Sequence, residues 1–319
     1  MTQLMPIDFT ENLSLSAYPY ASRRLPILAR NGVVATEEPL AAQAGLRILQ
    51  RGGNAVDAAL ATAIALTVTS PAANGLGSDA FALVWDGAKL HGLNGSGRAG
   101  AASSPELFAK LGLEAVPMLG WLSVTVPGAP AAWADLHARF GRLPFEALFE
   151  PAIEYAERGF PVAPLTAGRW ATSAQYYAQL PARPELAPWR EAFTRDGRAP
   201  AAGETWASPD VARTLRRLAH DGSHVFYTGD IADRIAEFAA ATGGYLTRAD
   251  LAAHTSTWVE PIGVSYRGHE IWEIPPNTNG IVALNALAIL EGIELAKHPR
   301  ESAETYHVLI EAMKLAFAD

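Results

Sequence analysis

The sequence predicts a mixed α/β chain in which helices and strands alternate and form layers. Residues 55–69 contain a single charged side chain and are typical of a helix, and residues 281–290 form a second, nearly all-apolar helix. Because a helix that is apolar on nearly all sides must be covered on nearly all sides, both are expected in a core. Residues 80–85 and 89–93 are short apolar runs separated by Asp86-Gly87, a strong hairpin signal.

Turn and capping residues predict the first part of the chain. Residues 1–30 are expected to form an irregular arm, followed by a short strand at 31–35. Thr36 can cap a helix that runs to about Gln50, and the two glutamates after it suit the positive end of the helix dipole. Residues 52–54, Gly-Gly-Asn, then form a turn, because glycine and asparagine tolerate positive φ.

The rest of the chain alternates further elements, with glycine and proline at their ends. Residues 160–200 are rich in proline and aromatic side chains, and residues 160–250 are expected to form a largely helical lobe. Helices are expected at 104–108, 131–140, 144–158, 208–220, 231–241, 247–251 and 303–317, strands at 123–130, 261–266 and 270–274, and a tight polar loop at 275–280.

The composition excludes several classes of function. The 319 residues carry a net charge of -8, which argues against a nucleic-acid partner, because such a partner requires clustered lysine and arginine. The absence of cysteine excludes disulfides, thiolate metal ligands and a cysteine nucleophile in this chain. No signal-peptide pattern and no membrane-spanning apolar stretch is visible, so we expect a soluble, cytoplasmic protein.

Common catalytic and cofactor motifs are missing or wrongly placed. Gly75 and Gly77 follow a helix and precede a strand, the reverse of the dinucleotide-binding order. The histidines are scattered, and a helix-breaking Asp-Gly-Ser sequence separates His220 from His224, so we expect neither a metal nor a cofactor. No Gly-x-Ser-x-Gly nucleophile elbow is present.

Arg98 is the best single functional candidate that the residues offer. It ends a flexible polar loop, residues 94–98, directly after an expected core strand. A guanidinium in that place can clamp a carboxylate with two hydrogen bonds. The alternative is an ordinary solvated or salt-bridged arginine, and the pattern taken by itself favours that alternative.

An ordered series of motifs resembles the large subunit of the gamma-glutamyltranspeptidase family, which is part of the N-terminal-nucleophile (Ntn) hydrolases. The resemblance covers about residue 31 to the end of the chain. The motifs are Ala41-Ala42-Gln43-Ala44-Gly45, Gly52 to Ala59, Val126-Pro127-Gly128, Phe140 to Pro144, Gly159-Phe160, Phe226 to Ala232, Gly243 to Thr247, Asp250-Leu251, Pro275 to Gly280 and Glu311 to Asp319.

The resemblance implies the large-subunit half of a four-layer αββα sandwich with an added helical region, over residues 31–319. Family members are made as one precursor, a zymogen that cleaves itself before a threonine. That threonine then attacks an amide, with its own amine as the general base. No catalytic residue is therefore expected in this chain, and the nucleophile is expected after Asp319, in a small subunit from the same precursor. The resulting heterodimer could pair into a dimer of heterodimers.

The loop that carries Arg98 departs from the family pattern. The family has an Arg-Glu-x-Ala-Pro segment here, whose arginine binds the substrate's α-carboxylate, and this chain lacks the glutamate and the proline. Alignment on the alanine places Ser96 opposite the family arginine, whereas a shift of two residues places Arg98 there. The family's glycine run is also replaced by residues 75–81. The resemblance thus assigns substrate binding to Arg98, with Ser96 as the competing polar candidate.

The resemblance implies an autoprocessed amidohydrolase or acyltransferase that cleaves an amide of a small carboxylate-bearing substrate. One alternative is a hydrolase of another small amide, an oxamate-type amidohydrolase or an acylase, without transpeptidase activity. An alternative of another class is a non-catalytic family member that serves in binding or assembly. Neither nucleic acid nor a membrane is expected as a partner.

Overall fold

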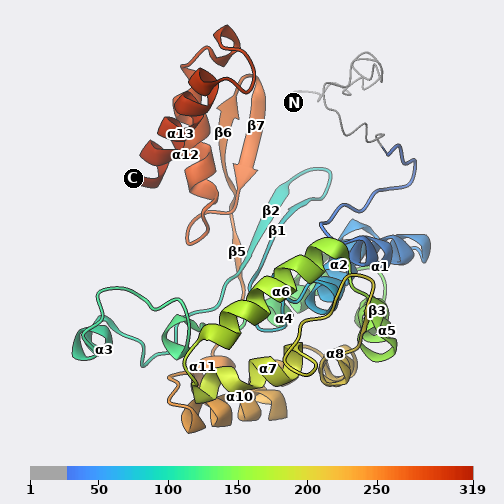
Figure 1. Ribbon diagram of the computed structural model, residues 1–319. Helices are drawn as coiled ribbons and strands as arrows, with labels where there is room; N and C mark the ends of the chain where they lie inside the picture. The colour runs from blue at the N-terminus through green and yellow to red at the C-terminus, as the bar shows by residue number, and fades with distance from the viewer. Residues whose placement is uncertain (1–26, 319) are drawn as a thin grey trace. The chain divides into compact units, whose positions relative to one another are not determined.

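A computed structural model describes residues 27–318 of the chain (Figure 1). The chain divides into two units, residues 1–33 and residues 34–319, which are described separately. In the first unit, residues 27–33 contain no helix or strand, and the rest of the expected arm lies outside the described residues, as does Asp319. The strand expected at 31–35 is wrong, since these residues hydrogen-bond to no other strand of the described part.

Two packed helices begin the second unit, α1 (Pro39–Gln50) and α2 (Ala55–Thr69). The bounds of α2 are as predicted, and most of its residues are buried. The predicted cap of α1 is wrong. Glu38, not Thr36, caps the helix, because its carboxylate accepts a hydrogen bond from the N–H of Ala41 at 2.9 Å.

Asp57 is fully buried and ties the start of α2 to a distant loop. Its carboxylate accepts hydrogen bonds from the backbone N–H groups of Asn54 at 3.0 Å, Arg142 at 3.0 Å and Leu143 at 3.2 Å. Asn54 caps α2 in return, by accepting the Asp57 N–H at 2.9 Å. A buried carboxylate is tolerated where N–H groups surround it in this way, so Asp57 has a structural role.

A three-stranded antiparallel sheet has the order β1-β2-β5. β1 (Ala80–Trp85) and β2 (Leu90–Gly95) form the predicted hairpin, and β5 (Thr257–Val259), which no pattern indicated, pairs with β2. α4 (Ala129–Phe140) packs on β1 and β2. The alternate side chains Phe81, Leu83 and Trp85 on β1 are exposed.

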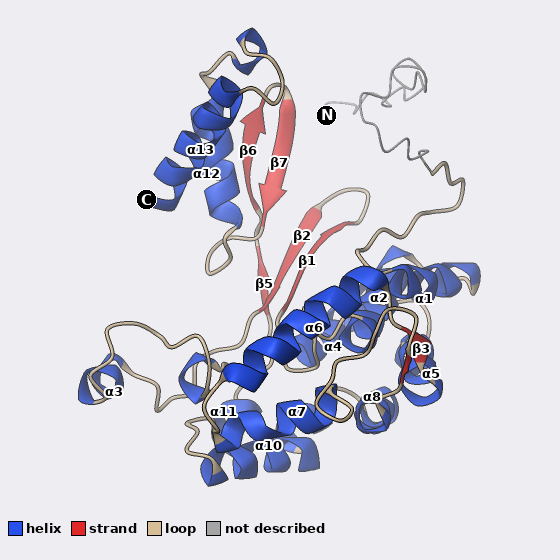
Figure 2. Cartoon of the chain, viewed as in Figure 1, coloured by secondary structure: helices blue, strands red, loops and turns tan. Residues whose placement is uncertain are grey.

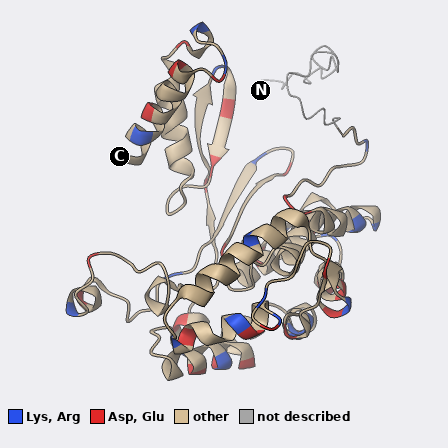
Figure 3. Ribbon diagram, viewed as in Figure 1, with Lys and Arg blue, Asp and Glu red and all other residues tan. Residues whose placement is uncertain are grey.

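The middle of the chain is mostly helical (Figure 2). It contains α3 (Pro105–Lys110), α5 (Glu150–Arg158), β3 (Phe160–Pro161), α6 (Pro164–Gln179), α7 (Ala187–Phe193), β4 (Thr205–Trp206), α8 (Pro209–Asp221), α9 (Val225–Thr228), α10 (Asp230–Ala241) and α11 (Arg248–Ala252). β3 and β4 pair as a two-stranded sheet. α8 and α10 both carry acidic and basic side chains (Figure 3).

Proline accounts for two wrong predictions in this part. Residues 124–128 form a loop with one bridge between Ala99 and Thr125, and residues 129–130 already begin α4. Pro127 lacks the N–H group that a ladder needs, and Pro130 suits the first turn of a helix. The helix expected at 144–158 is a short 3₁₀ turn, Phe145–Leu148, followed by α5. Pro151 lies in the first turn of α5, where its missing N–H is tolerated.

The last elements form a hairpin and two helices. β6 (Ile262–Tyr266) and β7 (His269–Glu273) pair across Arg267-Gly268 as predicted, and α12 (Gly280–Glu291) packs on both α13 (Ala303–Ala318) and the hairpin (Figure 1). The expectation that α12 is covered on nearly all sides is wrong within the described residues. Ile281 and Ile289 of α12 are exposed, because its neighbours contact only part of its surface.

The fold class is confirmed as mixed α+β, and the strand pairs of the described residues are antiparallel. The main core gathers side chains of α1, α2, α4, α5 and α8 with Leu93 of β2. Among the described residues, no helix is both long and apolar enough to cross a membrane.

Candidate functional site

The candidate site is the loop of residues 95–98, which continues from the end of β2 and carries both predicted side chains, Ser96 and Arg98. The loop lies directly against residues 126–128. A Cβ atom on Gly97 would stand 1.5 Å from the carbonyl oxygen of Val126, and one on Gly128 would stand 1.7 Å from that of Gly95. Only glycine fits at either position, so the backbone path of the loop is fixed by close approach.

Backbone hydrogen bonds join this loop to two further segments. The N–H of Val126 donates to the carbonyl oxygen of Arg98 at 2.9 Å, and the N–H of Gly97 donates to Asp79 Oδ1 at 3.3 Å. The first N–H groups of α4, those of Gly128 and Ala129, donate to the carbonyl oxygen of Ser78 at 3.1 and 2.9 Å. The glycine-rich loop that precedes β1, the loop of residues 95–98 and the start of α4 therefore hold one another.

Ser96 lies in a cluster of neutral polar side chains. Its hydroxyl hydrogen-bonds to the amide group of Asn277, with Oγ 3.2 Å from Asn277 Oδ1 and 3.1 Å from Nδ2. Asn94 Nδ2 donates to Asn277 Oδ1 at 2.9 Å, and Asn94 Oδ1 accepts the N–H of Ser96 at 2.9 Å. The polar loop predicted at 275–280 thus closes against the end of β2.

Arg98 has a different environment, although it is only two residues away. Its side chain is exposed, and in the described part of the chain no carboxylate lies within ion-pair distance of its guanidinium. Of the two alternatives to a binding role, a salt-bridged arginine is not seen within the described residues, whereas an ordinary solvated arginine agrees with the exposed side chain. The guanidinium stands on a fixed backbone and is available to a ligand.

Tyr227 fixes the segment that supports the loop. Its side chain is buried, and its hydroxyl donates to the carbonyl oxygen of Pro127 at 2.8 Å and accepts the N–H of Ala131 at 3.0 Å. Burial strongly raises the pKa of this phenol, so the hydroxyl stays protonated and keeps its donor role. Sequence reasoning found the motif that contains Tyr227 but gave this residue no role.

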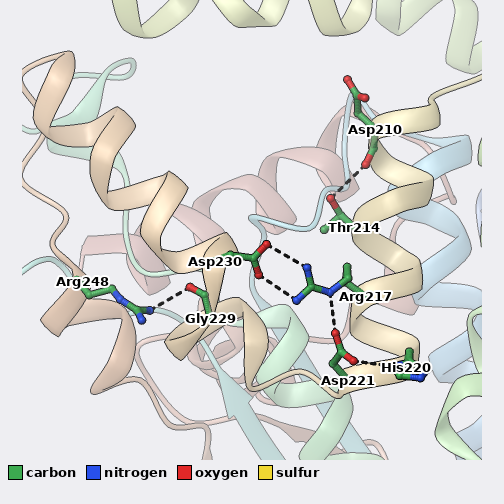
Figure 4. Close-up of polar contacts among 8 residues, drawn as sticks. All are labelled: Asp210, Thr214, Arg217, His220, Asp221, Gly229, Asp230 and Arg248. Atoms are coloured by element: carbon green, nitrogen blue, oxygen red, sulfur yellow. Dashed lines mark hydrogen bonds and ion pairs between the residues drawn. The ribbon is translucent and has the colours of Figure 1, made fainter.

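Arginines on α8 and α11 hold the segment around Tyr227 (Figure 4). Arg248 donates to the carbonyl oxygens of Thr228 at 2.5 Å and Gly229 at 3.2 Å, which end α9. Arg217 makes two bonds of 3.0 Å to Asp230, at the start of α10, and one of 2.7 Å to Asp221. These contacts anchor both ends of the turn between α9 and α10.

His254 follows α11 and stacks on Tyr227, with ring centroids 5.1 Å apart and an interplanar angle of 21°. Its Nε2 atom is buried and has no hydrogen-bond partner among the described residues. Burial first, and then the positive charge of Arg98, lower the pKa of His254 from its ordinary value of 6.5, while Asp135 and Asp79 act in the opposite direction. The imidazole is therefore neutral at neutral pH.

α11 also accepts a hydrogen bond from the backbone just after Arg98. Asp250 Oδ1 accepts the N–H of Ala101 at 2.8 Å, while Oδ2 accepts the N–H and the hydroxyl of Thr247 at 2.8 and 2.6 Å. Sequence reasoning missed Asn94, Asn277, Tyr227 and His254 as neighbours of the loop. The only signal for Asn277 and Tyr227 was their place in motifs that resemble the family. Asn94 begins the predicted polar loop, and His254 lies in none of these motifs.

No group of three or more histidine, aspartate or glutamate side chains in the described part of the chain could hold a metal ion. α8 ends at Asp221, and Gly222 takes a φ of 84°, so His220 and His224 do not share a helix face, as predicted.

Comparisons with known proteins agree on one family. The family model described as Gamma-glutamyltranspeptidase matches residues 41–319. The chain is 36% identical over 296 residues to a protein named glutathione hydrolase-like YwrD proenzyme from Bacillus subtilis, covering 92% of this chain and 55% of that protein. It is 34% identical over 300 residues to the oxamate amidohydrolase proenzyme of Klebsiella pneumoniae, covering 91% and 54%.

Solved structures give the same result. A cephalosporin acylase from Bacillus halodurans superposes with a TM-score of 0.88 at 51% identity, over 95% of this chain and 56% of that one. The gamma-glutamyltranspeptidase of Helicobacter pylori superposes with a TM-score of 0.83 at 27% identity, over 92% and 84%. The chain spans about half the length of the curated relatives that it matches.

Proposed function

Because the chain belongs to the gamma-glutamyltranspeptidase family, we propose that it forms the large-subunit part of an Ntn-type amidohydrolase or acyltransferase. The nucleophile is a threonine on a small subunit cleaved from the same precursor. Three of the relatives named above are called proenzymes or acylases, which supports both the processing and the amide chemistry.

In the proposed reaction the threonine hydroxyl attacks the carbonyl carbon of the amide, and the threonine's own amine takes the hydroxyl proton. The C–N bond then breaks, and the leaving amine carries that proton away. The resulting ester between threonine and the acyl group is hydrolysed by water, or it passes to an acceptor amine. In this scheme the chain described here contributes recognition and not the reacting atoms.

Arg98 is the proposed carboxylate-binding group. The observation that carries this assignment is an exposed guanidinium with no carboxylate partner in the described residues, on a loop fixed by the close approach of Gly97 to Val126. Ser96 is less suited to an anion, because its hydroxyl is already bonded to Asn277. In this assignment Ser96 and Asn277 form an uncharged polar surface beside Arg98.

Hydrolysis is favoured over transpeptidation by two observations. The chain is 51% identical to a cephalosporin acylase, against 27% to the transpeptidase of Helicobacter pylori. In addition, the loop that carries Arg98 lacks the glutamate and the proline of the family's Arg-Glu-x-Ala-Pro segment. A substrate with a small carboxylate-bearing acyl group or amine therefore fits better than a strict gamma-glutamyl donor.

The proposed small subunit has surfaces on which to bind. Trp85 on β1 is 57% exposed and Phe317 on α13 is 66% exposed. An apolar groove of about 590 Å³ runs along α13 beside Ile310, Met313 and Phe317. Exposed apolar area of this kind is typical of a surface that another chain covers.

Intact mass measurement and N-terminal sequencing of the purified full-length product test the proposal. We expect two polypeptides, of which the smaller begins with threonine, and release of the amine product from small carboxylate-bearing amides. A single uncleaved polypeptide without amidase activity would contradict the proposal and favour a binding or assembly role. Adding glycylglycine as an acceptor separates the two activities, since a hydrolase gives no transfer product.

A further inference from the structure

A second cavity lies in the helical part of the chain, between the end of α6, the turn after it and α7. Its volume is about 620 Å³, which is in the range of pockets for small ligands. Alanine, leucine and proline side chains form most of its lining, and none of its residues belongs to the loop of residues 95–98 or to the segments that hold that loop. The cavity is therefore not part of the candidate site described above.

One wall of the cavity is a pair of stacked aromatic rings. Tyr177 of α6 and Trp189 of α7 lie parallel, with centroids 4.2 Å apart and an interplanar angle of 5°. The same two rings also line a smaller hollow of about 280 Å³ beside Trp170. Trp170 is fixed in turn, because its Nε1 donates to the carbonyl oxygen of Phe193 at 2.7 Å. Phe193 also contacts Trp189, with ring centroids 5.7 Å apart.

Two guanidinium groups line the same cavity, and each lies against a glycine. A Cβ atom on Gly197 would come within 2.8 Å of Arg190 Nη2, and a Cβ atom on Gly120 would overlap the guanidinium of Arg183. Both glycines have positive φ, of 74° and 96°, which other residues rarely adopt. The backbone therefore leaves room for both side chains.

The two arginines differ in whether they are already paired. Arg183 is bonded to the carboxylate of Glu185. Arg190 makes no ion pair within the described residues, and Glu191, which also lines the cavity, forms none with it. Arg190 is the cation that a ligand can use.

We propose that this cavity binds a planar aromatic carboxylate, with its ring against Trp189 and its carboxylate on Arg190. An aromatic ring gains dispersion and quadrupole interactions against the Tyr177 and Trp189 pair. The carboxylate gains two charge-assisted hydrogen bonds from one guanidinium. A neutral aromatic compound keeps the first contribution and loses the second.

Titration calorimetry with 2-naphthoate, and with its neutral amide 2-naphthamide, tests this site on the full-length protein. We expect 2-naphthoate to bind about tenfold more tightly than 2-naphthamide, the difference made by one charge-assisted pair. Arg190→Gln should remove that difference, because it lowers only the affinity for the carboxylate. Trp189→Leu should weaken both ligands by about tenfold.

Arg234→Gln is the matched control, because it removes an exposed guanidinium on α10, outside both sites. It should leave 2-naphthoate binding unchanged, and this outcome is independent of whether the protein hydrolyses amides. Arg190 is exposed, so its replacement does not endanger folding, and circular dichroism checks the Trp189 variant. The proposal fails if neither ligand binds, if Arg190→Gln changes nothing, or if Arg234→Gln abolishes binding.

Discussion

The hydroxyl of Tyr227 donates to the carbonyl oxygen of Pro127, 100 residues away in the sequence, at 2.8 Å. Through this bond α9 supports the segment against which Gly97 is packed. The position of Arg98 therefore depends on elements far from β2. Substitutions in segments far from Arg98 in the sequence can therefore test how the loop is held in place.

Tyr227→Phe should weaken this support without removing the ring. The carbonyl oxygen of Pro127 and the N–H of Ala131 each lose a partner, and we expect a loss of about 1–3 kcal/mol in the free energy of unfolding. Urea denaturation followed by circular dichroism measures it. Tyr176→Phe is the control, because Tyr176 is 47% exposed. Equal stability of the two variants would mean that the buried hydroxyl contributes nothing.

Gly97→Ala should displace the loop that carries Arg98. The added Cβ would stand 1.5 Å from the carbonyl oxygen of Val126, so the loop or its neighbour must move. We expect a rise in KM of about tenfold or more, since small misplacements of a binding group are costly. Gly77→Ala is the control, because a Cβ atom added there would have no atom within 4 Å and its φ is not positive. Unchanged kinetics in the Gly97 variant would show that the loop tolerates the shift.

Arg98→Ala should affect charged and neutral substrates differently. If Arg98 binds a carboxylate, kcat/KM for carboxylate-bearing amides falls by about 10- to 100-fold, while that for neutral amides hardly changes. Arg98→Lys should restore part of the activity, since it keeps the charge but not the bidentate geometry. Steady-state kinetics on matched substrate pairs measure this. Equal losses on both substrates would remove the carboxylate-binding role from Arg98.

The lowered pKa of His254 should make its contribution to the free energy of unfolding decrease on mild acidification. Its pKa in the folded protein lies below the ordinary 6.5, so the unfolded chain binds more protons just below that value. The contribution of His254 to stability should therefore fall as the pH drops through about 6.5 towards its lower folded pKa, opposite in sign to that of His220, whose pKa Asp221 raises, and His254→Gln should remove the His254 contribution. Urea midpoints between about pH 7.5 and 5.5 provide the test.

The control for this titration is His269→Gln, on the exposed part of β7. It should keep the slope of the unchanged protein. Arg98→Gln should reduce the slope in part, because the Arg98 charge is the second cause of the lowered pKa of His254. A slope that His254→Gln leaves unchanged would assign the effect to another group.

Local patterns predicted the elements that local chemistry decides. The bounds of α2 follow from the Asn54 cap and an apolar run, and the β1–β2 hairpin follows from Asp86-Gly87. The strand predicted at 123–130 is wrong because an apolar pattern takes no account of Pro127, which lacks a ladder N–H, or of Pro130, which lies in the first turn of α4. The three-residue β5 could not be predicted, since only pairing with β2 makes it a strand.

The candidate site was predictable only in part, for a similar reason. Arg98 stood out as a cation in a glycine-rich loop after a strand, and both it and Ser96 do lie in that loop. Asn277, Tyr227 and His254 come from segments more than 100 residues away, and no periodicity or spacing links them to residue 98. Their roles arise from tertiary packing, which a single sequence does not show.

The outer edge of β1 has a consequence for handling the protein. β1 ends its sheet, so one row of its backbone N–H and C=O groups has no strand beside it in the described residues, and Phe81, Leu83 and Trp85 are exposed on the same strand. Such an edge is a template on which another extended chain can add. The isolated chain should therefore self-associate as its concentration rises, and light scattering should fall when Leu83 is replaced by lysine.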